Sequence, residues 1–142
     1  MSLDREKTNV TFALNMAKKY YSEETYNHAM RVMHYVAEND MIPYEYKDDC
    51  LILAIMHDLI EDTEYNGYGL SENLKKALFL LTKPHNVDYI DYIKDIKNTG
   101  YTNWRMCAYW VKLADMKDHL AQKETLTDKL KEKYLNALAY LL

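Results

Sequence analysis

The sequence predicts an all-α fold in a single domain, and three observations support this prediction. The chain of 142 residues has three glycines and two prolines, whereas average composition would give about seventeen such residues. Sandwiches, barrels and doubly wound sheets need Gly and Pro at many turns, so the composition argues against these folds. A hydrophobic fraction of 49% argues against a disordered chain, and apolar residues recur at helical spacing.

Apolar stripes and caps define the first of about six or seven helices. The first runs over residues 10–21, where apolar side chains recur every three or four positions. Ser22 is the expected N-cap of a second helix, because its side chain can accept from a backbone N–H and Glu23 sits at the positive helix end. This helix stops before Pro43, and a third helix covers about residues 44–62.

The later helices follow the same pattern. A fourth begins at Ser71 and ends at a Lys-Pro pair. A short fifth helix over residues 89–96 is closed by Gly100, since glycine is favoured just after a helix end. A sixth helix spans residues 102–121. The last, over residues 130–141, is Leu-rich and can pack within the chain or form a homodimer seam.

Composition also limits the partners. A net charge of −4 argues against a binder of nucleic acid or of membrane surfaces. The longest apolar run is far shorter than the roughly 20 residues that a membrane span needs. No linker or signal-peptide pattern is found, so one domain over residues 1–142 is expected, of which residues 1–3 can be a cloning remnant. Cys50 and Cys107 fall in apolar helical patterns, which favours reduced, buried thiols in a cytoplasmic protein.

The third predicted helix carries ionisable residues beside a stretch that should be buried. Seven apolar residues run directly into His57 and Asp58. Glu61 and Asp62 follow one turn later, so four ionisable groups crowd one flank of the helix. Carboxylates near a core cost several kcal/mol and repel one another unless a positive charge holds them.

A metal ion is the economical source of that charge. No Lys or Arg occurs between Lys47 and Lys75, although a distant basic side chain can substitute for an ion. Two other helices offer ligands: Asp115 ends an apolar stretch, and His28 lies roughly 110° from the centre of its helix's apolar stripe. His34, on the opposite flank, is expected at the surface. Two imidazoles and two carboxylates suit Mn, Fe, Co or Zn better than Ca, and a mixed set with open positions is typical of catalysis.

The order of these residues resembles the HD superfamily of metal-dependent phosphohydrolases. Residues 26–32 (YNHAMRV) resemble its first motif. Residues 54–63 (AIMHDLIEDT) are very similar to the HDxxEDT signature of the branch that hydrolyses the alarmones ppGpp and pppGpp, and residues 81–83 (LTK) and 111–115 (VKLAD) resemble two further segments. The resemblance covers about residues 10–122 and implies an HD-type helical bundle.

The resemblance implies a site and a reaction. One divalent ion, manganese in the alarmone branch, would be bound by His28, His57, Asp58 and Asp115. Iron, cobalt, zinc and nickel are alternatives. Glu61 and Asp62 would orient water and shuttle protons; the alternative, a solvated helix end, is disfavoured because carboxylates there oppose the helix dipole. The implied reaction on a small-molecule nucleotide is hydrolysis of the alarmone 3′-pyrophosphate.

The chain departs from the alarmone pattern where the substrate would bind. His119 stands four positions after Asp115, where the alarmone branch has an Asn, and Gln122 stands where it has a Thr. The basic segment that precedes the first motif in that branch is missing here, and Lys19 lies nearest to its usual position. Lys19, Lys112 and His119 are candidate substrate contacts, although lysines are more often solvated and His119 can instead bond the ligand shell, cap or pack. Three alternatives stay open: hydrolysis of another nucleotide or small phosphoester, a non-catalytic nucleotide or metal sensor, and a helical interaction protein without a site.

Overall fold

Helix α4 (Tyr44–Met56) lies at the centre of the fold because its second half is apolar on every face, and Cys50 and residues 52–56 are buried. The computed structural model describes residues 9–98 and 103–142, and these ranges contain helices and no strand. The helices packed against α4 are α2 (Val10–Tyr20), α3 (Glu23–Glu38), α6 (Glu72–Leu80) and α8 (Asn103–Ala121). The prediction of an all-α, single-domain fold is confirmed.

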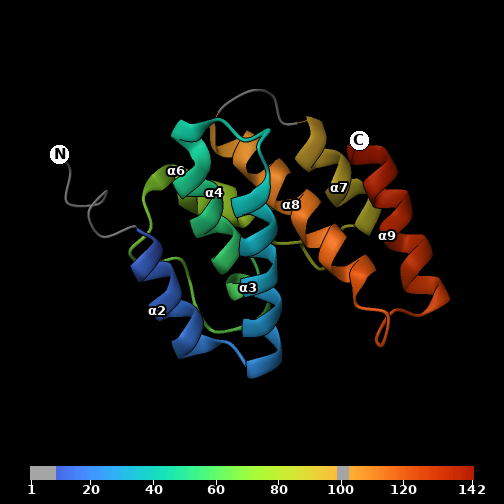
Figure 1. The fold of residues 1–142 in the computed structure, drawn as a ribbon, viewed down its shortest axis with the longest axis horizontal. Helices are drawn as coiled ribbons and strands as arrows, with labels where there is room; N and C mark the ends of the chain where they lie inside the picture. The colour runs from blue at the N-terminus through green and yellow to red at the C-terminus, as the bar shows by residue number, and fades with distance from the viewer. Residues whose placement is uncertain (1–8, 99–102) are drawn as a thin grey trace.

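The C-terminal part of the chain adds a second group of helices. Helix α7 (Tyr89–Asn98) packs against α9 (Asp128–Leu141), and both contact α8. Figure 1 shows α7 and α9 on the side of α8 away from α2. The predicted Gly100 stop, the first residue of the predicted sixth helix and the proposed cloning remnant lie outside the described residues. Within the described ranges, no helix is both long and apolar enough to cross a membrane.

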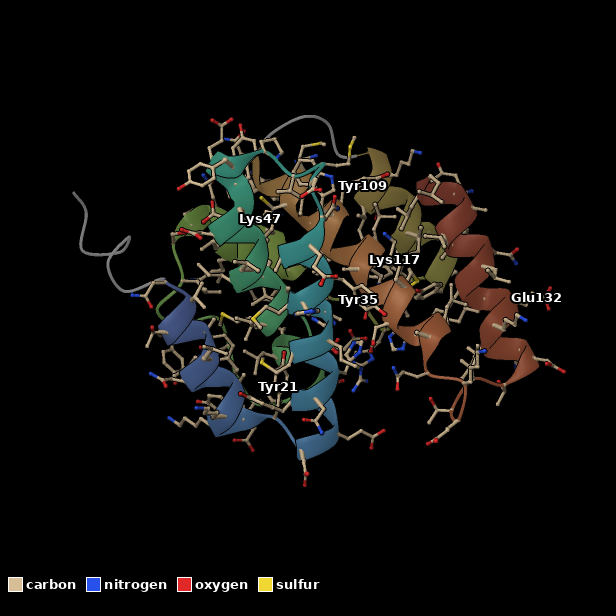
Figure 2. The ribbon with its side chains drawn as sticks, viewed as in Figure 1. Tyr21, Tyr35, Lys47, Tyr109, Lys117 and Glu132 are labelled. Atoms are coloured by element: carbon tan, nitrogen blue, oxygen red, sulfur yellow. The ribbon has the colours of Figure 1, made fainter. Side chains whose placement is uncertain are left out.

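Polar contacts at both ends of α3 fix its position. The Ser22 hydroxyl accepts a hydrogen bond from the Thr25 backbone N–H at 3.2 Å, which confirms the predicted N-cap. At the other end, Lys47 of α4 (Figure 2) donates to the carbonyl oxygens of Val36 at 3.0 Å and Asn39 at 2.7 Å. A lysine at this place adds a second donor to carbonyls at the end of the helix and complements the helix dipole. The Lys47 contacts hold the C-terminal end of α3 against α4.

Two side-chain predictions are confirmed. His34 is exposed and contacts Glu38 one turn along α3, at 3.1 Å. Cys50 and Cys107 are both free and buried, and a hydrogen bond between the two thiols, together with burial, raises the pKa of Cys50.

The single helix predicted over residues 44–62 is wrong in one respect. Helix α4 ends at Met56, and a separate turn of helix, α5 (Leu59–Asp62), begins after His57 and Asp58. The break places Asp58 near the bridge region of backbone space, with φ −98° and ψ 0°. The His57–Asp58 pair therefore lies in a turn between two helices rather than on a helix flank.

A tyrosine from another segment explains this break. Tyr21, which follows α2 (Figure 2), donates its hydroxyl hydrogen to the Ile55 carbonyl at 2.8 Å. The same hydroxyl oxygen accepts from the Asp58 backbone N–H at 3.2 Å. Nδ1 of His57 bonds the Ala54 carbonyl at 2.7 Å. These side chains use backbone groups that would pair with each other in a continuous helix, and such insertions are an established cause of helix interruption.

We expect Tyr21→Phe to lower the free energy of unfolding by about 1–3 kcal/mol, since it leaves the Asp58 N–H and the Ile55 carbonyl without their partner. The measurement is urea denaturation followed by circular dichroism. The matched control is Tyr35→Phe, since the half-buried Tyr35 hydroxyl forms no hydrogen bond with any described residue. Equal effects of the two substitutions would show that the Tyr21 hydroxyl does not hold the turn.

Candidate metal centre

Four side chains from three distant segments meet at one point, here called the His/Asp cluster: His28 of α3, His57 and Asp58 of the α4–α5 turn, and Asp115 of α8. Nε2 of His28 lies 2.9 Å from Oδ1 of Asp115 and 3.6 Å from Oδ2 of Asp58. Nε2 of His57 lies 3.2 Å from each of the same two oxygens. The two Nε2 atoms are 3.2 Å apart. The structure thus brings together all four metal ligands predicted from the sequence.

The hydrogen bond at Nδ1 of His28 and of His57 determines whether Nε2 of the neutral ring carries a hydrogen or a lone pair. Nδ1 of His57 faces the Ala54 carbonyl, which can only accept. Nδ1 of His28 faces the Asp118 carboxylate at 2.6 Å, and a carboxylate also accepts. In a neutral imidazole whose Nδ1 carries the hydrogen, Nε2 has only a lone pair. Two lone pairs and two carboxylate oxygens therefore face one another, and a proton on each ring or a cation between them is needed.

The spacing of the cluster fits a divalent ion. First-row ions bind imidazole nitrogen and carboxylate oxygen at about 2.0–2.2 Å, which places neighbouring ligand atoms about 3.0–3.5 Å apart. The separations in the His/Asp cluster run from 2.9 to 3.6 Å. His28 belongs to two groups of three residues, and within each group the ligand atoms lie within 4.8 Å of one another. One group contains His57 and Asp58, and the other contains Asp115 and His119.

The pKa shifts describe the cluster without an ion. Burial disfavours a charged His57, but Asp58 and Asp115 outweigh burial and hold its pKa well above the ordinary value. Burial is also the largest single effect on His28, but Asp115 and Asp118 together outweigh it and raise the pKa of this imidazole. Burial disfavours the Asp115 anion, yet Lys112 and the histidines hold the pKa of this carboxyl well below its usual range. Protons on the imidazoles thus take the place of a cation.

Asp118 is a site residue that the sequence analysis missed. Its side chain is fully buried. One carboxylate oxygen accepts from His28 Nδ1, and the other accepts from Arg31 Nε at 2.8 Å. Burial disfavours the Asp118 anion, but the hydrogen bond from Arg31 helps to lower the pKa of this group. A carboxylate behind a histidine is a common second partner in metal sites, where it fixes ring orientation and tautomer. The spacing of three residues from Asp115, on one face of a helix, was the available signal.

Lys112 is buried rather than solvated, so the general expectation for lysines does not hold here. It is 7% exposed, and Nζ donates to Oδ2 of Asp115 at 2.9 Å. The ammonium also lies 4.9 Å from the centre of the Tyr92 ring. Burial disfavours its charge, but Asp115 together with Tyr92 and Tyr89 outweighs burial and raises the pKa of Lys112 well above its usual value.

The sequence analysis allowed a distant basic side chain to replace a metal ion, and basic side chains do neutralise some of the carboxylates here. Lys112 compensates Asp115, and Arg31 compensates Asp118. Asp58 differs, because its ion-pair contacts among the described residues are with His28 and His57 only. When these two imidazoles are neutral, the Asp58 charge has no partner. This remaining negative charge favours a cation at the cluster.

A cavity of about 230 Å³, here called the polar cavity, opens beside the cluster. Its lining combines acidic, basic and aromatic side chains, including Asp58, Glu61, Asp62, Asp115, Lys83, Lys112, Lys133, His119, Tyr89, Tyr92 and Tyr134. Lysines on its wall give it positive charge for an anion. The carboxylates on the same wall would repel an anion unless a metal ion were bound.

Lys83 and Lys133 are the two lysines of the polar cavity without a carboxylate partner among the described residues. Lys83 is held by hydrogen bonds from Nζ to the carbonyls of Val87 at 2.7 Å and Pro84 at 2.9 Å. Lys133 of α9 lies 4.1 Å from the centre of the Tyr89 ring. Burial, followed by repulsion from other lysines of the cavity, lowers the pKa of Lys133. Lys133 was not a candidate in the sequence analysis, because α9 lies beyond the region that resembles the HD superfamily.

The remaining predicted residues occupy different places. Glu61 and Asp62 line the polar cavity as exposed residues, and partial desolvation together with the Asp58 charge raises the pKa of each carboxyl. Nε2 of His119 lies 3.2 Å from Oδ1 of Asp115, and the ring stacks on Tyr134 of α9, so two of its alternative roles, bonding the ligand shell and packing, are present. His119 also lines the polar cavity, and its role as a substrate contact stays a prediction. Lys19 is exposed on α2, with Nζ 5.2 Å from the Tyr20 ring centre, and does not line the polar cavity.

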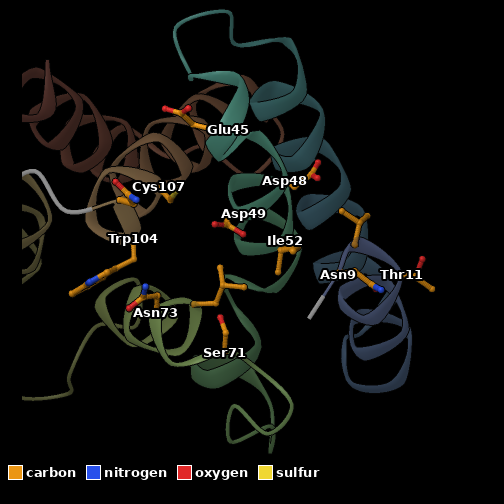
Figure 3. A pocket seen from close by; sticks show the side chains of 13 residues that line it. Asn9, Thr11, Glu45, Asp48, Asp49, Ile52, Ser71, Asn73, Trp104 and Cys107 are labelled. Atoms are coloured by element: carbon orange, nitrogen blue, oxygen red, sulfur yellow. The ribbon is translucent and has the colours of Figure 1, made fainter. Parts of the chain in front are cut away.

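A larger groove of about 710 Å³ lies elsewhere in the described structure (Figure 3). It is bordered by the first residues of α2, α6 and α8 and by the acidic side chains of α4, Glu45, Asp48 and Asp49. Its lining contains none of the residues of the His/Asp cluster. Volume alone therefore does not locate the candidate site.

Without metal, we expect the free energy of unfolding to fall as pH rises above about 6.5, the ordinary histidine pKa. His28 and His57 have raised pKa values in the folded state. They stabilise the fold fully below the unfolded-state pKa, and this stabilisation is lost as pH rises through the folded-state pKa. Added zinc should stabilise most at high pH, since metal ligation needs neutral imidazoles.

The measurement is urea denaturation from about pH 6 to about pH 9, with a chelator or with zinc. The exposed-histidine control, His34→Asn, should keep the pH dependence of the wild type. If the free energy of unfolding of the metal-free protein stayed constant or rose with pH, the conclusion that the two Nε2 lone pairs face carboxylates would be wrong.

No family model and no curated protein matches this chain. Its function therefore has to be inferred from the geometry and chemistry of the centre itself.

Proposed function

We propose that this chain is an HD-type, metal-dependent phosphohydrolase that acts on a nucleotide, with the 3′-pyrophosphate of ppGpp and pppGpp as the first substrate to test. One observation carries the proposal: the lone pairs and carboxylates of the His/Asp cluster meet beside a cavity lined by both carboxylates and lysines. The sequence order of His28, the His57–Asp58 pair and Asp115 supports the HD type.

In the proposed reaction, water attacks the phosphorus that is bound to the ribose 3′-oxygen. The bond between this phosphorus and the 3′-oxygen breaks. The products are pyrophosphate and a nucleotide with a free 3′-hydroxyl. A divalent ion held by His28, His57, Asp58 and Asp115 would lower the pKa of water and neutralise charge on the phosphoryl oxygens.

The protein's own residues have separate roles in this proposal. Glu61 takes a proton from the attacking water, and its raised pKa suits a general base. Asp62 orients the same water. Lys83 and Lys133 attract the phosphate oxygens into the polar cavity, because neither has a carboxylate partner among the described residues. Lys112 keeps Asp115 ionised and in place.

A second candidate is hydrolysis of another nucleotide or of a small phosphoester. The polar cavity of about 230 Å³ is smaller than the roughly 300–1,000 Å³ of sites that enclose drug-sized ligands. A cavity of this size suits phosphate groups and leaves a base outside it. The replacement of Asn by His119 points the same way, because His119 lines the polar cavity. Gln122 does not line this cavity, and its side-chain amide instead donates to Asp118 at 3.4 Å. A non-catalytic sensor would bind metal and nucleotide without turnover.

We expect the manganese-loaded protein to release pyrophosphate from ppGpp in a panel that also contains 5′-nucleotides and small phosphoesters. Asp58→Asn should lose metal affinity and turnover together. Glu61→Gln should keep its metal but lose about 10²–10⁴-fold in kcat, the usual contribution of a general base. Glu64→Gln makes the same change at an exposed neighbour and should behave as wild type.

The outcomes separate the candidates. Turnover of another phosphoester but not ppGpp would establish the second candidate. Bound metal with no turnover of any compound in the panel would contradict an enzyme and favour a sensor. Undiminished turnover in Glu61→Gln would remove this residue from the mechanism.

A further inference from the structure

A third imidazole reaches the His/Asp cluster. Nε2 of His119 lies 3.2 Å from Oδ1 of Asp115, and the same oxygen is 2.9 Å from His28 Nε2 and 3.2 Å from His57 Nε2. Three imidazole nitrogens from three segments thus surround one carboxylate oxygen. The donors of His28, Asp115 and His119 all lie within 4.8 Å of one another. Trans ligands of an octahedral ion are about 4.2 Å apart, so this spacing fits a shared ion.

The His119 ring is held in place by its neighbours. It stacks on Tyr134 of α9, with the ring centres 4.6 Å apart and the planes at 7°. Its other neighbour is the His28 ring, at 4.8 Å between centres. The side chain is 36% exposed, so this ring borders the open part of the site rather than its buried side. A ligand in this position needs no rearrangement of the helices.

We propose that His119 is a third imidazole ligand of the metal centre, and that it shifts the preference of the centre from manganese toward zinc and cobalt. Imidazole nitrogen binds zinc and cobalt more strongly than manganese, which is better suited to oxygen ligands. Two imidazoles and two carboxylates supply equal numbers of nitrogen and oxygen ligands. A third imidazole nitrogen makes nitrogen the majority and so favours zinc and cobalt over manganese. The inference rests on the metal centre of the proposed function, but not on its reaction.

Two variants separate ligation from other roles of His119. His119→Phe keeps a flat ring against Tyr134 and removes both nitrogens. His119→Gln keeps a hydrogen-bond donor for Asp115 and removes the imidazole, so it would rescue a residue that serves only as a donor. His34→Phe makes the matched change at an exposed histidine of α3. Circular dichroism establishes that each variant is folded.

The experiment measures affinity for zinc, cobalt and manganese by competition with a chromophoric chelator, and the number of imidazoles on zinc by X-ray absorption. We expect both His119 variants to lose at least about 10–100-fold in zinc and cobalt affinity, which is the cost of losing even an outer-shell partner of a ligand, and much less in manganese affinity. The imidazole number should fall from three to two. His34→Phe should match the wild type in both measurements.

Two imidazoles on zinc in the wild type, or full affinity in His119→Gln, would overturn the inference while leaving the proposed reaction intact. Three imidazoles in a protein that hydrolyses no phosphoester would support the inference and contradict the proposed reaction.

Discussion

Four hydrogen-bond acceptors face one another where α3, the α4–α5 turn and α8 meet, and most features of the site follow from this constraint. Nε2 of His28 and His57 have lone pairs because each Nδ1 faces an acceptor of its own. The opposing atoms are oxygens of Asp58 and Asp115. Buried acceptors that face one another cost several kcal/mol. Protons relieve this repulsion at low pH, and a divalent ion relieves it at any pH where the imidazoles are neutral.

The surrounding residues hold these acceptors in place and leave the repulsion unrelieved. Tyr21 interrupts the central helix so that His57 and Asp58 lie in a turn. Asp118 fixes the tautomer of His28, and Lys112 binds the oxygen of Asp115 that faces away from the histidines. Every buried polar side-chain atom of the described residues has a polar neighbour at hydrogen-bond distance, although inside the His/Asp cluster these contacts are hydrogen bonds only when the imidazoles carry protons at Nε2. When both imidazoles are neutral, this supported centre holds an uncompensated negative charge at Asp58, and such a site is organised for a cation.

The sequence predicted the helices and the four side chains that meet in the His/Asp cluster, because both depend on local patterns. Apolar periodicity and the Ser22 cap gave the helices, and ionisable residues next to apolar stretches marked His28, His57, Asp58 and Asp115. The break after Met56 was not predictable in the same way, since it depends on a hydroxyl from a distant segment. The burial of Lys112 and Asp118 depends on how α8 packs against α3 and its neighbours, and the place of Lys133 depends on where α9 docks. Periodicity within one helix contains no information about such contacts.

Binding of a divalent ion by the His/Asp cluster is tested most directly by anomalous X-ray diffraction from crystals grown with zinc, recorded on both sides of the zinc absorption edge. We expect a peak about 2.0–2.2 Å from Nε2 of His28 and His57 and from a carboxylate oxygen of Asp58 and Asp115. The absence of a peak at this position in excess zinc, or zinc bound only at the acidic groove beside α4, would contradict a metal centre at the cluster.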